Sequence, residues 1–146
     1  MRRHEFVQIP KDARALEGLN YRDYFDDRGR ARAGVIALVL GDRPVWNNTG
    51  AYSQADAERA TPARIGQLAL KFFSGFVACS VDGQPRVGLD YYGVTILKDD
   101  ALGAIAARGL EGVRLHGLGG RRAAGRFVAF CADAEQNGRW VAHFGP

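Results

Sequence analysis

The longest uncharged apolar run in this sequence extends only from Gly34 to Gly41. A helix that crosses a membrane needs about 20 consecutive apolar residues, so this run is too short to form one. Its length, its β-branched residues and the glycines at its two ends favour a buried strand. A chain whose apolar residues come in segments this short must build its core by packing several strands and helices together.

Other short segments have the composition or the alternation of β-strands. Residues 4–9 roughly alternate and end at Pro10, which predicts a short edge strand, because proline cannot donate a hydrogen bond to a sheet. Residues 92–97 are rich in β-branched side chains and predict a core strand. Residues 140–144 predict a final strand, in which we expect the ring of His143 to pack at a sheet edge.

Apolar residues at spacings of three and four predict the helices. A threonine followed by proline, or an acidic residue, marks the start of a helix, and a glycine marks its end. The glycine-rich stretch 109–125 predicts irregular structure. The first two predicted helices are a broken segment within 12–27 and residues 61–80. A third starts at Asp99 or Asp100, buries Leu102, Ile105 and Ala106, and stops at Gly109. The last covers residues 123–136 and ends at Asn137-Gly138.

Strands and helices are mixed irregularly along the chain. This order favours an α+β fold over a doubly wound one. The chain has 146 residues, of which 47% are hydrophobic and 25% charged, as in an ordinary soluble domain. We therefore predict a single α+β domain over residues 1–146, with a mostly antiparallel sheet packed against about three to four helices.

Arginine dominates the charge of this protein, whose 20 basic and 16 acidic residues give a formal net charge of +4. A guanidinium group matches phosphate and carboxylate oxygens, but abundant arginine, alanine and glycine also reflect GC-rich coding. Arg121, Arg122 and Arg126 lie at the expected start of the 123–136 helix, where backbone amides and arginines together could bind an anion. A flexible loop with solvated arginines is the alternative reading.

The sequence gives two indications of a cytoplasmic location. The basic start, Met1 to Glu5, is not followed by the apolar segment of a signal peptide. The two cysteines, Cys79 and Cys131, both fall in apolar helical patterns, where free thiols behave as small hydrophobic groups. We therefore expect free thiols and no membrane association.

The residues that carry catalysis or bind metals are few and scattered. The histidines, His4, His116 and His143, lie far apart in sequence and far from the cysteines, so we expect no metal site. Cys131 lies in the middle of an apolar helical stripe, which argues against a reactive thiolate. We expect no catalytic residue and no cofactor.

The segment 21–27 combines aromatic and acidic residues within a basic protein. Aromatic side chains anchor many protein interfaces, and neighbouring carboxylates can be directed at a cationic partner. The alternative is a helix end whose rings belong to the core and whose acids are solvated. The candidate partner-binding residues are Tyr21, Asp23, Tyr24, Asp26 and Asp27.

The C-terminal half resembles small bacterial immunity proteins. The resemblance rests on the stretch Leu89–Leu97 with its Tyr-Gly-Val-Thr motif, the helix at 123–136 and the closing segment Trp140–Pro146. Such proteins are cytoplasmic antitoxins encoded beside the toxins of contact-dependent growth inhibition and other polymorphic systems. The resemblance implies stoichiometric, non-catalytic inhibition of a cognate toxin C-terminal domain, and it transfers no active-site residue.

The net positive charge narrows the choice of partner. Inhibitors of basic nucleases are commonly acidic, because opposite charge speeds capture. Either the toxin is not a basic nuclease, or the contact is local, for instance through Asp23, Asp26 and Asp27. One alternative function is an arginine-rich module that binds nucleic acid, although we do not expect nucleic acid to be the partner. Another is a small-ligand-binding protein with a pocket near Tyr91, Tyr92 and residues 117–122. The oligomeric state stays open.

Overall fold

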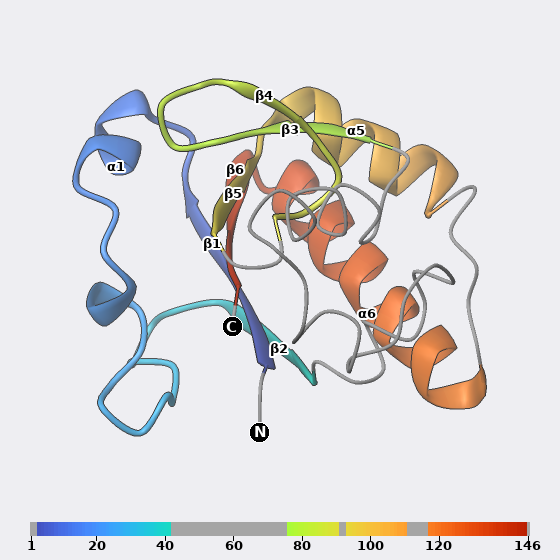
Figure 1. Cartoon of the computed structure of the whole chain (residues 1–146), viewed down its shortest axis with the longest axis horizontal. Helices are drawn as coiled ribbons and strands as arrows, with labels where there is room; N and C mark the ends of the chain where they lie inside the picture. The colour runs from blue at the N-terminus through green and yellow to red at the C-terminus, as the bar shows by residue number, and fades with distance from the viewer. Residues whose placement is uncertain (1–2, 42–75, 91–92, 111–116, 146) are drawn as a thin grey trace, which may run out of the picture.

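A computed structural model describes residues 3–41, 76–90, 93–110 and 117–145 of the chain. These residues form one six-stranded antiparallel sheet with helical segments on both faces (Figure 1). The strands, in the order in which they lie side by side, are β2 (Ala37–Gly41), β1 (Arg3–Pro10), β6 (Arg139–Phe144), β5 (Val94–Leu97), β3 (Val77–Cys79) and β4 (Pro85–Val87).

The described residues contain three α-helices: α1 (Ala13–Glu17), α5 (Asp99–Arg108) and α6 (Gly117–Gln136). A short 3-10 helix, η1 (Tyr21–Asp23), follows α1. Helices α5 and α6 cover one face of the sheet, whereas α1 and η1 lie on the opposite face (Figure 1). The predicted α+β class with an antiparallel sheet is confirmed. In the described part of the chain, no helix is long and apolar enough to span a bilayer.

Alternation along the internal strand β1 divides the core into two layers. Phe6 belongs to the layer beneath α5 and α6, where its ring contacts the ring of Phe127 at a centroid distance of 5.2 Å. Val7 and Ile9 point to the other face and pack with Phe25. All five of these side chains are fully buried, and each contributes about 1.5–3 kcal/mol to stability.

The position of β1 and β6 differs from the prediction. Residues 4–9 are a strand, but β1 pairs with β2 on one side and with β6 on the other, so it is not an edge strand. Strand β6 is likewise internal, because it also pairs with β5, and His143 is therefore fully buried rather than at a sheet edge. Pairing between distant segments decides this order, and local alternation does not reveal it.

The end of the predicted 61–80 helix is also wrong. Residues 77–79 form β3, which pairs with β4 and, through Cys79, with β5. The apolar residues at 76 and 79 fit a helical spacing, but pairing with β4 and β5 stabilises residues 77–79 as a strand instead. The predicted helix from 61 to 75 lies outside the described residues.

Local signals place the ends of the last two helices. Gly109 and Gly138 have φ of +66° and +65°, and each follows a helix that the sequence predicts to end there. Within α5, Leu102 and Ile105 are buried as predicted, whereas Ala106 is exposed. The predicted irregular structure is wrong for residues 117–122, which already belong to α6 ahead of the predicted start at residue 123.

Candidate functional site

The loop that contains the predicted partner-binding residues runs over residues 20–32, and we call it the 20–32 loop. It leaves α1, crosses one face of the sheet as η1 and then projects from the body of the molecule (Figure 1). Asn20 begins it by accepting a hydrogen bond from the backbone N–H of Arg22 at 3.1 Å. The cap is the one that asparagine commonly supplies at a helix start.

Aromatic rings anchor the loop to the sheet. Phe25 is fully buried, and Tyr21 stacks on it at a centroid distance of 4.9 Å. Tyr21 also meets Phe144 of β6 edge to face at 5.4 Å, and Tyr24 contacts the same ring. Tyr21 and Tyr24 are therefore half-buried supports of the loop, and most of their ring surface is already occupied within the protein.

A polar contact ties the loop to β1. Arg3 pairs with Glu5 at 3.0 Å and donates a further hydrogen bond to the carbonyl of Gly29. Burial, followed by a side-chain hydrogen bond to Glu5, raises the pKa of Tyr21. Gly29 has φ of +71°, a backbone conformation that favours glycine, and an added Cβ would also displace the Arg3 guanidinium from its present position.

Asp26 organises the tip of the loop. One carboxylate oxygen, Oδ1, accepts hydrogen bonds from the backbone N–H groups of Arg28 and Arg30, both at 2.9 Å. The hydrogen bond from Arg30 is the main reason that the pKa of Asp26 is lowered. Asp26 therefore holds the turn, whereas Asp23 and Asp27 are exposed and direct their charge outward.

The predicted anion-binding arginines are not at a helix start. Helix α6 begins at Gly117, so Arg121, Arg122 and Arg126 lie within it, and the backbone N–H groups at residue 123 and beyond lie inside the helix. All three side chains are exposed. The expected combination of free amides and arginines is therefore wrong at this position.

Two histidines and one cysteine lie deep in the core. His4 Nδ1 and His143 Nε2 are 2.9 Å apart, and both side chains are fully buried. Burial, followed by the proximity of His4, holds the pKa of His143 well below its usual value. Burial also raises the pKa of Cys131 far above its usual range. Residue His116 lies outside the described part. Among the described residues, no group of three or more potential ligands could hold a metal ion.

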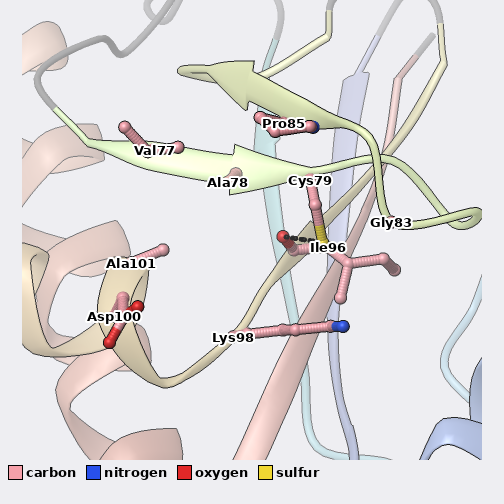
Figure 2. A pocket seen from close by; sticks show the side chains of 9 residues that line it. All are labelled: Val77, Ala78, Cys79, Gly83, Pro85, Ile96, Lys98, Asp100 and Ala101. Carbon is pink, nitrogen blue, oxygen red and sulfur yellow. Dashed lines mark hydrogen bonds between the residues drawn. The ribbon is translucent and has the colours of Figure 1, made fainter.

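A small pocket lies between the β3–β4 hairpin and the start of α5 (Figure 2). Its volume is about 190 Å³, below the roughly 300–1,000 Å³ of most ligand sites. The Cys79 thiol points toward Ile96, whose carbonyl accepts its weak hydrogen bond at 3.7 Å. Burial raises the pKa of this thiol as well. This pocket is not the one predicted near Tyr91 and Tyr92, which lie outside the described residues.

The sequence singled out the segment 21–27 but did not reveal that Asp26, unlike Asp23 and Asp27, holds a turn. The Arg28-Gly-Arg-Ala-Arg32 stretch begins two residues after Asp26, and an aspartate placed two residues before a glycine-containing basic stretch is a recognisable turn signal. Sequence reasoning also missed the His4–His143 pair, because the two residues lie on strands whose pairing is not local.

In comparisons with known proteins, the chain matches no family model, no curated protein and no solved structure.

Proposed function

We propose that this protein is an immunity protein. It binds the C-terminal domain of a cognate bacterial toxin in the cytoplasm and neutralises it as a stoichiometric inhibitor, with no catalysis of its own. The proposal starts from the resemblance of the C-terminal half to such proteins. It is supported by where the described fold puts its reactive and its charged groups.

The observation that carries the proposal is the contrast between the core and the 20–32 loop. His4, His143 and Cys131, which could act as bases or nucleophiles, have buried side chains. The loop instead displays exposed charged side chains on a backbone fixed by Asp26 and anchored by Phe25. A preorganised surface loses little conformational entropy on binding, which favours tight protein recognition.

The test uses the toxin domain encoded by the adjacent gene. We expect co-expression to restore growth, and the purified proteins to form a complex with nanomolar affinity by isothermal titration calorimetry. Absence of binding to an active toxin domain would contradict the proposal.

A second measurement separates binding from catalysis. When the toxin domain is titrated with this protein, the remaining toxin activity should fall linearly and reach zero near equimolar ratio. An inhibitor that acts as an enzyme would instead abolish toxin activity at a small molar fraction, progressively with time. A matched sample of heat-denatured protein serves as the control.

A further inference from the structure

We infer that the toxin partner offers an acidic protein surface to the arginine side chains of the 20–32 loop, chiefly Arg28 and Arg30. This inference rests on the proposed function and names the contact that the partner must make. The partner surface is then acidic, whereas the acidic residues of the same segment led us to expect a basic one.

The arginines of the loop lie close together. Arg28 and Arg30 donate their backbone N–H groups to the same oxygen of Asp26. The side chain of Arg32 crosses to Arg22, where its Nε donates to the backbone carbonyl at 2.6 Å. The charges of Arg30 and Arg32 are also close enough to help lower the pKa of Asp26. The backbones of Arg28 and Arg30 and the charges of Arg30 and Arg32 thus gather around Asp26 at the tip of the loop.

The guanidinium groups of Arg28 and Arg30 are available to a partner. Both residues are exposed, and neither takes part in the ion pairs formed among the described residues. Asp26, whose carboxylate feels the charge of Arg30, already accepts two backbone hydrogen bonds. A guanidinium group binds a carboxylate through two parallel hydrogen bonds, so each of these arginines can receive one aspartate or glutamate of a partner.

The backbone that carries these arginines is held in place from both sides. Arg3 on β1 donates to the carbonyl of Gly29, which lies between Arg28 and Arg30. The backbone N–H of Asp26 donates to the carbonyl of Arg30 at 2.9 Å, which closes the turn. Phe25 fixes the base of the loop in the core. The charges are therefore presented in one arrangement before a partner arrives.

Two features favour a protein over a nucleic acid. Asp23 and Asp27 are exposed on the same loop. A nucleic acid carries a phosphate at every nucleotide and has no basic side chain to place opposite them, whereas an acidic protein can place one there. Nucleic acids also bind by stacking bases on aromatic rings, but Tyr21 and Phe25 stack on each other and Tyr21 packs against Phe144. A mixed surface of arginines and aspartates suits an acidic protein that carries some basic residues.

The experiment compares two charge reversals of equal size. Arg28→Glu with Arg30→Glu changes the loop, and Arg121→Glu with Arg122→Glu changes exposed arginines of α6 as the matched control. Binding of the adjacent gene's toxin domain is measured by surface plasmon resonance at several salt concentrations. We expect the loop variant to associate about 10- to 100-fold more slowly and to lose most of its salt dependence. The control should bind within about threefold of the wild type, and both variants should keep its Tm.

The outcomes distinguish the inference from the proposed function. Wild-type binding with an unaffected loop variant overturns the inference and leaves the proposed function standing. A wild-type protein that does not bind the toxin domain overturns both. A mixed-sequence oligonucleotide is assayed in parallel by fluorescence anisotropy. If the oligonucleotide binds in a loop-dependent manner while the toxin domain does not bind, the loop recognises nucleic acid and the acidic-protein inference is wrong.

Discussion

Asp26 and Asp27 are neighbours in sequence, but they have different structural roles. Asp26 accepts the two backbone hydrogen bonds that shape the tip of the 20–32 loop, whereas the carboxylate of Asp27 is exposed. Sequence alone presents them as equivalent acids of one patch. At the scale of single residues, the side chain of Asp26 therefore stabilises the loop, whereas that of Asp27 is exposed and free to contact a partner.

Replacing Asp26 tests this distinction. We expect Asp26→Ala to lower Tm in thermal unfolding, because the N–H groups of Arg28 and Arg30 lose their acceptor. Asp26→Asn should keep most of the wild-type Tm, since its amide oxygen can accept the same bonds. Asp27→Ala is the matched control and should leave Tm unchanged. Equal losses in Asp26→Ala and Asp27→Ala would show that Asp26 has no special structural role.

At the scale of elements, helix α6 contains a glycine with room for a side chain. Gly125 is exposed in the helix, and an added Cβ would meet no atom within 4 Å. Glycine costs a helix about 1 kcal/mol relative to alanine, chiefly through its greater freedom in the unfolded chain. Gly125 therefore lowers the stability of α6, and in the described part of the chain no close packing contact explains why a glycine is present there.

The corresponding prediction is a pair of opposite effects. Gly125→Ala should raise the free energy of unfolding by about 0.5–1 kcal/mol in urea denaturation. Gly138→Ala, just beyond the C-terminal end of α6, should lower the free energy of unfolding, because the φ of +65° suits glycine and strains alanine. A destabilising Gly125→Ala would mean that the glycine serves a close contact.

The sequence predicts elements better than it predicts their neighbours. The ends of α5 and α6 follow from Gly109 and from Asn137-Gly138, which act locally. The internal positions of β1 and β6 in the sheet depend on pairing between residues that are far apart in the chain. The same limit applies to the candidate site: the aromatic-acidic segment was recognisable, but the role of Asp26 depends on backbone groups that only the folded loop brings together.

At the scale of the whole molecule, the buried His4–His143 pair links stability to pH. The folded pKa of His143 is lowered, whereas in an unfolded chain it lies near the usual value of about 6.5. Above that value both states are neutral and the group has no effect. As the pH falls below it, the unfolded chain takes up a proton that the folded protein excludes. Stability must therefore decrease with acidification.

We expect the free energy of unfolding to fall between pH 7 and pH 5, by up to about 1.4 kcal/mol per pH unit for this one proton. Urea titrations across this range measure the slope. His143→Gln removes the titrating group and should reduce the slope, even though the variant is less stable at every pH. An unchanged slope in His143→Gln would assign the pH dependence to other groups.

The internal position of β6 has a consequence for how the protein is made. Strand β6 joins β2 and β1 on one side to β5, β3 and β4 on the other. Until residues 139–144 have left the ribosome, a nascent chain holds two separate sheet fragments with unpaired inner edges. The six strands can therefore join only after residues 139–144 have been made, and a shorter nascent chain is a ready target for chaperones and proteases.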